Sequence, residues 1–395
     1  MRSMSPPIET TLLLRNARVV LPDRVAAVSL VVVAGRIARI CEADSVAPMP
    51  DAVDYDLSGA TLWPGFIDVH IHGAVGVDMM EATPGDLARV SRFLAAQGVT
   101  AWLPTLVPAP PALYQSAINS ISALIKEQSS QVGARALGVH YEGPFVNSEQ
   151  CGALHRDHFR TFSSGADLDD LLTVSNPDAV HMMTLAPEVE GGIELVRELR
   201  RRGWIVSIGH TRADSKLLDR AFEAGAGHMT HFMNAMAPLH HRAPGPVAWG
   251  LLRDDVTCDV IADGIHLDLV TLRLLQKLKT PECLSLISDA IAAAGLGDGE
   301  YEIWGETISV REGRTRNSRG RIAGSVITML DAVRMMLSLG VSEVEVARMA
   351  STNPARLLHK EEECGSIEEG KRADLVGLDE ERNVRFTMVG GEVFD

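Results

Sequence analysis

The chain has few cysteines, and none of them form a pair of the kind that binds zinc. The five cysteines among its 395 residues are widely scattered, and no two of them are separated by only two residues. An odd, dispersed set argues against a disulfide framework and against a cysteine-based zinc site. We therefore expect a protein of the reducing cytoplasm.

Basic residues are also scarce, and long hydrophobic runs are missing. Lys and Arg number 37 against 52 Asp and Glu, which gives a net charge of -15. Nucleic-acid binding depends on neutralising phosphates with Lys and Arg, so we expect no nucleic-acid partner. No apolar run is long enough to span a bilayer, and the amino terminus lacks the apolar core of a signal peptide, so we expect no membrane association. Residues before about Ile8 are expected to form a loose tail.

The middle of the sequence alternates short apolar runs with helical stretches. Eight runs occur, at residues 65–72, 99–105, 136–142, 179–186, 204–210, 227–231, 256–264 and 284–290. The helical candidates at 83–98 and 191–203 end in glycine, which is a helix stop signal. This alternation predicts an α/β fold with a TIM-like (β/α)8 barrel over residues 65–362.

Both ends of the chain have the sequence pattern of short strands. Segments rich in Val, Ile and Leu precede residue 65, and short strands punctuated by glycine follow residue 362. Because chain termini often lie close together, residues 1–64 and 363–395 are predicted to form one small β-sandwich domain. Two helices are expected within 325–340 and 343–358, and a hairpin is expected over 299–324.

Polar side chains stand at the ends of several predicted strands, where a barrel carries its active site. In chain order they are His70 and His72, Glu142, His210, His231, Asp263 with His266 just beyond, and Asp289. Any one of these histidines alone could be structural, as we expect for His181 inside a run. Their coincidence at strand ends instead favours a shared site.

A glutamate with two histidines suits Zn²⁺ or Fe²⁺ and leaves an open position for water. Such an ion lowers the pKa of its water, and a nearby carboxylate such as Asp289 is suited to take the proton. The pattern indicates metal-assisted hydrolysis of an amide or related bond. His70 and His72 are two residues apart on a strand and point to the same side, so both can converge on one ion.

Longer segments carry a resemblance to a known family. PGFIDVHIHG, GVHYEGPFVN, THFMNAMAPLHHRAPG and ISDAIAAAGLGDG resemble the N-acetylglucosamine-6-phosphate deacetylase family of the amidohydrolase superfamily, and the resemblance runs from about residue 12 to 394. It implies that Glu142, His210 and His231 hold the catalytic metal, with one or two ions per subunit. His70 and His72 would hold the second ion. The resemblance also implies that Asp289 is the general base and then the acid.

The resemblance further implies a set of substrate contacts. A homodimer is implied, in which Arg242 acts either in the site of its own subunit or in that of the partner. A histidine after Glu142 would polarise the acetyl carbonyl; the family places it twelve residues on, whereas His155 is thirteen residues on, with His158 as the alternative. The residues expected to bind the sugar phosphate are Asn234, Ala235, Arg242, His266, Ile322, Ala323 and Gly324.

The implied activity is hydrolysis of N-acetylglucosamine 6-phosphate to glucosamine 6-phosphate and acetate, in amino-sugar catabolism. Three alternatives stay open: a deacetylase of another N-acetyl sugar phosphate such as N-acetylgalactosamine 6-phosphate, another amidohydrolase, and a non-catalytic barrel that only binds its ligand. The HHR and NAM segments argue against an unrelated amide substrate. The presence of Glu142, His210, His231 and Asp289 argues against a non-catalytic barrel.

Overall fold

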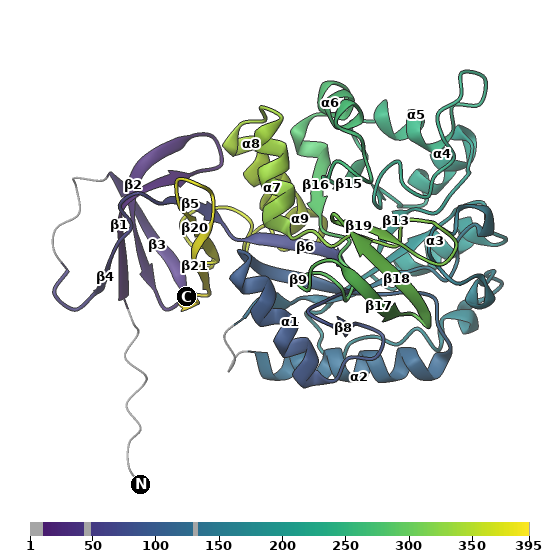
Figure 1. The fold of residues 1–395 in the computed structure, drawn as a ribbon, viewed down its shortest axis with the longest axis horizontal. Coiled ribbons are helices and arrows are strands. Elements are labelled where there is room, and N and C mark those ends of the chain that lie inside the picture. Colours follow the sequence, from purple (N-terminus) through teal and green to yellow (C-terminus); the bar gives the residue numbers. More distant parts are fainter. Residues whose placement is uncertain (1–10, 43–48, 129–132, 395) are drawn as a thin grey trace, which may run out of the picture.

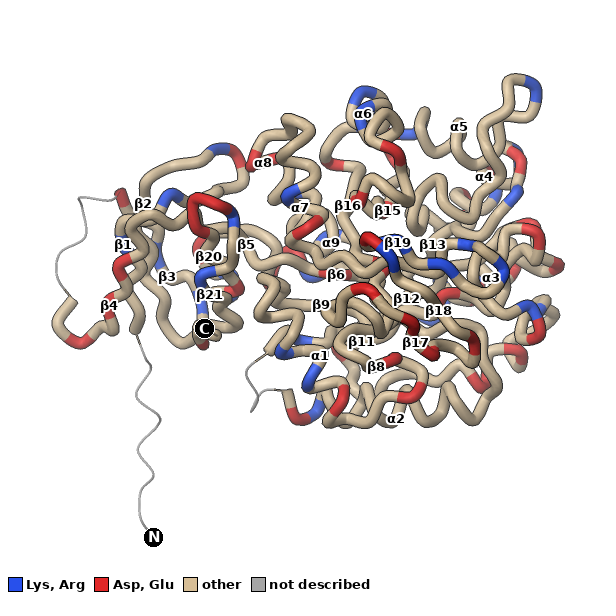
Figure 2. Tube along the Cα trace, in the orientation of Figure 1, with Lys and Arg blue, Asp and Glu red and all other residues tan. Residues whose placement is uncertain are grey.

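The computed structural model describes residues 11–42, 49–128 and 133–394, so the tail expected before Ile8 lies outside the described residues. Figure 1 shows a smaller lobe made of strands beside a larger lobe in which helices surround a sheet. Acidic and basic residues are interspersed along both lobes in Figure 2. No helix among the described residues is long and apolar enough to cross a membrane.

The smaller lobe is one eight-stranded sheet to which both chain ends contribute. Its order is β22-β21-β20-β5-β1-β2-β3, with β4 beside β1. Antiparallel pairing of β20 with β5 joins the two ends, as expected from the sequence. The strands are β1 (Thr11–Val20), β2 (Val25–Val33), β3 (Arg36–Glu42), β4 (Val53–Asp56), β5 (Thr61–Pro64), β20 (Leu375–Leu378), β21 (Val384–Val389) and β22 (Glu392–Phe394).

The larger lobe is built on a ring of parallel strands, which confirms the predicted barrel. A bridge between Ile71 and Ala290 joins the first strand to the segment after the last one, and the Asp289 N–H donates to the carbonyl of His70 at 2.9 Å. The strands are β6 (Phe66–Ile71), β9 (Val99–Leu106), β11 (Gly138–Glu142), β12 (Val180–Leu185), β13 (Ile205–Ile208), β14 (His228–Met229), β15 (Thr257–Ile261) and β16 (Leu284–Ile287), with β10 (Arg135–Ala136) extending the pairing to β9.

Local sequence explains where the helices around the ring begin. In α1, Thr83 caps the amino terminus and exchanges hydrogen bonds with Asp86, while Pro84 occupies the first turn. The two helices expected before the carboxyl-terminal strands form, the second with a π turn at 348–352. The helices are α1 (Pro84–Ala96), α2 (Pro111–Glu127), α3 (Gly192–Arg201), α4 (Ser215–Glu223), α5 (Gly245–Leu251), α6 (Leu269–Leu278), α7 (Met329–Ser338), α8 (Glu343–Ala347) and α9 (Asn353–Leu357).

The segment expected to be a hairpin is instead a three-stranded meander. It contains β17 (Gly299–Ile303), β18 (Glu306–Arg311) and β19 (Arg314–Arg316), all antiparallel. The prediction of a single hairpin was wrong because the segment contains two tight turns, Trp304-Gly305 and Glu312-Gly313, with all four residues at positive φ. A two-stranded ribbon of β7 (Gly73–Ala74) and β8 (Val77–Asp78) follows β6.

Candidate active site and metal centre

The carboxyl ends of three barrel strands bring Glu142, His210 and His231 together. Glu142 Oε1 lies 2.9 Å from Nε2 of His210 and 2.9 Å from Nε2 of His231. The two imidazole Nε2 atoms are 3.1 Å apart. All three side chains are buried. Residues that are far apart in sequence therefore meet at one point, because parallel strands end at the same edge of the barrel.

The hydrogen bonds around His210 fit this group to a metal ion. Its Nδ1 lies 2.8 Å from the carbonyl oxygen of Gln150, which can only accept a hydrogen bond. In the neutral ring the proton therefore sits on Nδ1, and Nε2 presents a lone pair to Glu142 and His231. Three lone-pair donors this close need a cation between them, and a carboxylate with two imidazoles is a donor set that suits zinc.

His70 and His72, from β6 and just beyond it, make a second group around the same carboxylate. Their Nε2 atoms are 3.1 Å apart. His72 Nε2 lies 3.4 Å from Glu142 Oε2, and His70 Nε2 lies 3.7 Å from Glu142 Oε1. Within the described ranges, these histidines with Glu142 form one candidate metal group, and Glu142 with His210 and His231 forms the other.

Asp289 follows β16 and faces both histidines of the second group. Its Oδ1 lies 3.3 Å from His72 Nε2 and 3.4 Å from His70 Nε2. The Asp289 backbone is fixed from both sides, because its N–H donates to His70 and its carbonyl accepts from Ser325 at 2.7 Å. A carboxylate held at this point can exchange a proton with a molecule bound between the two groups.

Three of these residues have an unusual backbone conformation. The φ angles are 48° at His210, 30° at His231 and 49° at Asp289. Residues other than glycine rarely adopt a positive φ. Those that do are often found at functional sites, where a particular side-chain direction is required. The strained positions coincide with the side chains that converge.

Burial and close charges shift several acid–base equilibria in this site. Burial raises the pKa of a carboxyl, but the adjacent imidazoles of His210 and His231 outweigh it and hold the pKa of Glu142 well below its usual range. Burial lowers the pKa of His70 well below its usual value. Burial also raises the pKa of Asp68 to about 7, although its carboxylate accepts a 2.5 Å hydrogen bond from the Ser288 hydroxyl.

A cavity of about 320 Å³ opens above these groups. This volume is within the range of small-molecule sites. Its floor contains Glu142, His210, His231 and Asp289. The remaining lining residues are His72, Gly152, Ala153, Leu154, Asn234, Ala235, His266, Trp304, Arg321, Ile322 and Gly324.

Comparison with known proteins shows which family the chain belongs to. The sequence model of the amidohydrolase family matches residues 61–394, most of the chain. The chain belongs to the amidohydrolase family. The N-acetylglucosamine-6-phosphate deacetylase of Bacillus subtilis (strain 168) is 37% identical over 336 residues, which cover 85% of this amidohydrolase and 84% of that protein.

Two further relatives have related names. The N-acetylgalactosamine-6-phosphate deacetylase of Escherichia coli O157:H7 is 36% identical over 350 residues, covering 88% of this chain and 91% of that protein. A solved structure of a Mycobacterium smegmatis N-acetyl-D-glucosamine-6-phosphate deacetylase variant, in complex with N-acetyl-D-glucosamine-6-phosphate, superposes with a TM-score of 0.87. It is 31% identical and covers 97% of this chain and 99% of that chain.

Most of the substrate contacts expected for this amidohydrolase reach the cavity. Asn234, Ala235, His266, Ile322 and Gly324 line it. His266 is oriented by Asp263, whose carboxylate lies 2.7 Å from its Nδ1 and accepts from its backbone N–H at 2.7 Å. The Asp263 predicted at a strand end thus acts on the site through His266.

Two of the expected substrate contacts do not line the cavity of their own chain. Ala323 is fully buried, and its N–H donates to the Thr315 hydroxyl. Arg242 is exposed on the loop after His231, where its Nη1 lies 2.9 Å from His241 Nε2.

The loop after β11 presents Leu154, and not a histidine, to the cavity. His155 is half-buried at the start of a short 3-10 helix, Arg156–His158, and neither His155 nor His158 is among the described residues that line the cavity. The polarising role proposed for His155 therefore stays a prediction. The residues of this loop that line the cavity are Gly152, Ala153 and Leu154, and none of them has an acid–base group in its side chain.

Sequence reasoning missed Trp304, Arg321 and Glu188. Trp304 and Arg321 line the cavity, and Arg321 also donates to the carbonyl of Gly152 at 3.0 Å. No spacing rule pointed to either residue, because they reach the site from the meander and from the segment that follows it. The dipeptide Trp304-Gly305 was the one available signal, since glycine often follows the first residue of a tight turn.

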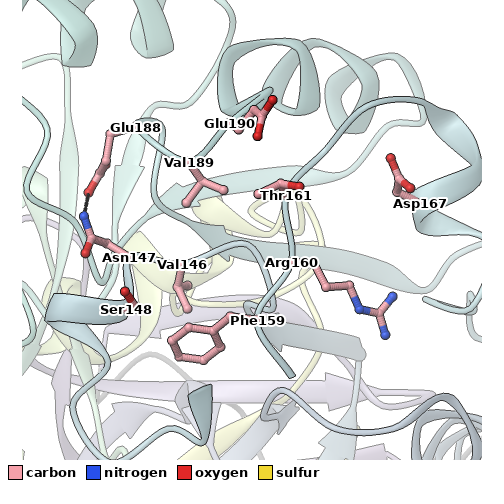
Figure 3. A pocket seen from close by; sticks show the side chains of 10 residues that line it. All are labelled: Val146, Asn147, Ser148, Phe159, Arg160, Thr161, Asp167, Glu188, Val189 and Glu190. Carbon is pink, nitrogen blue, oxygen red and sulfur yellow. Dashed lines mark hydrogen bonds between the residues drawn. The ribbon is translucent and has the colours of Figure 1, made fainter. Parts of the chain in front are cut away.

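Glu188 lines a second, larger cavity of about 680 Å³ next to the loop after β11. Figure 3 shows its carboxylate turned toward Asn147, which donates to it at 2.8 Å. The Thr211 hydroxyl and the Arg212 N–H also donate to it, each at 2.6 Å. Since the Asn147 N–H donates to the carbonyl of His210 at 3.0 Å, Glu188 braces that carbonyl through Asn147 and the two residues that follow it, Thr211 and Arg212, directly.

Proposed function

We propose that this amidohydrolase removes the acetyl group of N-acetylglucosamine 6-phosphate and releases glucosamine 6-phosphate and acetate. The observation that carries the proposal is the convergence of Glu142, His210 and His231 with Asp289 in one cavity. Named relatives that are deacetylases of N-acetyl amino-sugar phosphates support it. The scattered cysteines favour action in the cytoplasm.

Each polar group on the cavity floor has a role in this reaction. Glu142, His210 and His231 would hold a divalent metal, with zinc favoured over iron by the donor set, and His70 and His72 would hold a second ion. A metal bound there lowers the pKa of water and polarises a carbonyl.

Asp289 would move the proton. It takes one proton from the attacking water, whose oxygen bonds to the acetyl carbon, and delivers it to the nitrogen as the C–N bond breaks. The leaving group is then a neutral amine, and the acetyl group departs as acetic acid, which loses its remaining proton to the solvent and becomes acetate. No covalent enzyme intermediate is needed, so no serine or cysteine nucleophile is required.

The sugar phosphate would be bound by Asn234, Ala235, His266 and the segment Ile322–Gly324. Asp263 holds Nδ1 of His266, and Nε2 of the same ring has no hydrogen-bond partner in the part of the chain that the structure describes, so it can bind a ligand. We propose that Arg242 binds the phosphate, because a guanidinium offers a fork of donors that matches phosphate oxygens.

We propose that Arg242 acts in a homodimer, on the cavity of the partner subunit. Its exposure on a loop away from its own cavity supports this arrangement. So does an apolar stripe on α6, where Val270, Leu274 and Leu278 are 74%, 48% and 47% exposed at intervals of four residues. A mixture of inactive Arg242→Gln and Asp289→Asn proteins should regain activity, because a mixed dimer contains one intact site. No regain after subunit exchange would contradict the shared site.

The second candidate substrate is N-acetylgalactosamine 6-phosphate, favoured by the relative that is 36% identical and carries that name. Acetate release from both sugar phosphates should be measured side by side with metal-loaded protein and with Asp289→Asn. The proposal expects the higher kcat/KM for the glucosamine derivative and a large loss in the variant. It is wrong if neither compound yields acetate, or if the variant is as active as the wild type.

A further inference from the structure

Trp304 occupies a position that local backbone preference does not explain. The register of β17 and β18 pairs Ile303 with Glu306, so Trp304 and Gly305 form a two-residue turn. Their φ angles are 55° and 73°. Such turns favour Asn-Gly, and bulky residues rarely adopt positive φ. A tryptophan held in this conformation suggests that its side chain has a use beyond the turn.

The indole of Trp304 lines the cavity beside the reacting groups. Its ring meets the ring of His72 edge to face, with centroids 5.4 Å apart and an angle of 87° between the planes. His72 in turn lies 3.3 Å from the carboxylate of Asp289. Only one side chain therefore separates Trp304 from the carboxylate that would transfer the proton.

The meander that carries Trp304 is packed firmly onto the barrel. Ile303, Ile308 and Val310 belong to one buried apolar cluster with Ile291 and its neighbours, which directly follow Asp289. Arg319, just after β19, donates to the carbonyl of Ala153 at 2.8 Å and so joins the meander to the loop that carries Leu154. The meander that carries Trp304 is therefore held against the segment that follows Asp289, which fixes the position of Trp304 relative to the site.

The cavity is lined by both polar and apolar side chains. Asn234 and His266 offer polar groups that suit sugar hydroxyls and phosphate, whereas Trp304 and Leu154 are apolar. An amide whose carbonyl carbon lies beside Asp289 has the sugar amine on one side and the acyl chain on the other. When Asn234 and His266 bind the sugar, the acyl chain is left to the other lining residues near Asp289, and Trp304 is one of these through its contact with His72.

We propose that Trp304 is a specificity-determining residue that limits the acyl group to two carbons. The inference rests on the proposed deacetylase activity and adds to it the side chain that selects the acyl length. An apolar wall discriminates by about 10- to 200-fold for a methylene that does not fit. Removing the indole should open that space while leaving Glu142, His210, His231 and Asp289 in place, since among the candidate metal ligands it is the ring of His72 that the indole contacts.

The test compares the N-acetyl, N-propionyl and N-butyryl derivatives of glucosamine 6-phosphate, with glucosamine 6-phosphate as the common measured product. Wild type, Trp304→Ala and Trp304→Phe are compared with Thr307→Ala. Thr307 is an exposed residue of the same meander, and among the described residues its hydroxyl donates only to Glu302. Thermal unfolding of each variant reports whether the meander stays folded.

The wild type should lose kcat/KM with each added methylene. Trp304→Ala should raise the butyryl-to-acetyl ratio of kcat/KM by about tenfold or more. Trp304→Phe keeps an aromatic ring and should raise this ratio less; it provides the test if the alanine variant unfolds. Thr307→Ala should leave the ratio unchanged. A wild-type ratio in both tryptophan variants, with acetyl hydrolysis intact, overturns the role of Trp304. No product from any derivative with wild type overturns the deacetylase proposal itself.

Discussion

The Oε2 atom of Glu142 lies 3.4 Å from Nε2 of His72. The other oxygen of the same carboxylate faces His210 and His231, each at 2.9 Å. One carboxylate thus joins the two groups of candidate metal ligands, so that removing it should affect both, whereas removing a histidine pair should affect one.

The first prediction is that Glu142→Ala loses bound divalent metal from both groups. Without the shared carboxylate, each group keeps only two imidazoles, which are too few to hold an ion tightly. Metal content after dialysis, measured by plasma mass spectrometry, should fall to background. Glu194→Ala, on the exposed face of α3, should keep the wild-type content. Retention of metal by Glu142→Ala would contradict the shared role.

The second prediction concerns the first strand. A His70→Gln/His72→Asn double variant should lose one ion per chain and keep the ion at Glu142, His210 and His231. His181→Gln serves as the control, because His181 stacks on Trp204 outside the site. If stoichiometry and activity both stay at the wild-type level, no second ion of consequence binds at His70 and His72.

The third prediction separates proton transfer from metal binding. Asp289→Asn keeps the shape of the side chain but cannot accept a proton, so kcat should fall by about 10²- to 10⁴-fold, the usual contribution of a general base. Metal content should stay near that of the wild type. A variant that loses its metal as well would show that Asp289 is a ligand and not only a base.

The residues at the strand ends could be predicted from the sequence because all strands of a parallel barrel end at the same rim. Each apolar run fixes where a strand ends, and the fold brings those ends together, so Glu142, His210, His231 and Asp289 were found without coordinates. The positive φ angles of His210, His231 and Asp289 were not foreseeable, because an apolar run indicates where a strand ends and not the backbone angles of the residues beyond it.

Residues on loops could not be placed in the same way. The direction of a loop side chain depends on packing and not on periodicity, so the sequence offered no reason to choose Leu154 over His155 for the cavity wall. Trp304 was missed because the meander returns it to the site from a distant segment. Arg242 was expected to bind the phosphate, but it is exposed on the loop after His231 and does not line the cavity of its own chain.

The fourth prediction is that Glu188 supports metal binding from outside the cavity. Glu188→Gln keeps the size of the side chain but removes one acceptor from a carboxylate that receives three hydrogen bonds. Outer partners of metal ligands typically contribute about 10- to 100-fold to metal affinity, and a weakening of that order is expected in a Co²⁺ titration followed by absorbance. Glu190→Gln, in the same large cavity, should bind Co²⁺ like the wild type. Equal affinities in all three proteins would exclude the bracing role.

The last prediction uses two glycines with similar backbones and different surroundings. Gly324 and Gly320 have φ angles of 61° and 73°, so alanine at either position should cost about 1 kcal/mol of unfolding free energy through backbone strain. At Gly320 an added Cβ meets open space, whereas at Gly324 it would lie 2.8 Å from the carbonyl oxygen of Asp289 and 2.7 Å from Ile291. Gly324→Ala should therefore cost about 1–3 kcal/mol more, the range typical of overpacking. It should also lower kcat, because the only relief is to move the backbone of Asp289. Urea unfolding and steady-state kinetics of the two variants measure both effects, and equal losses would mean that the segment yields without disturbing Asp289.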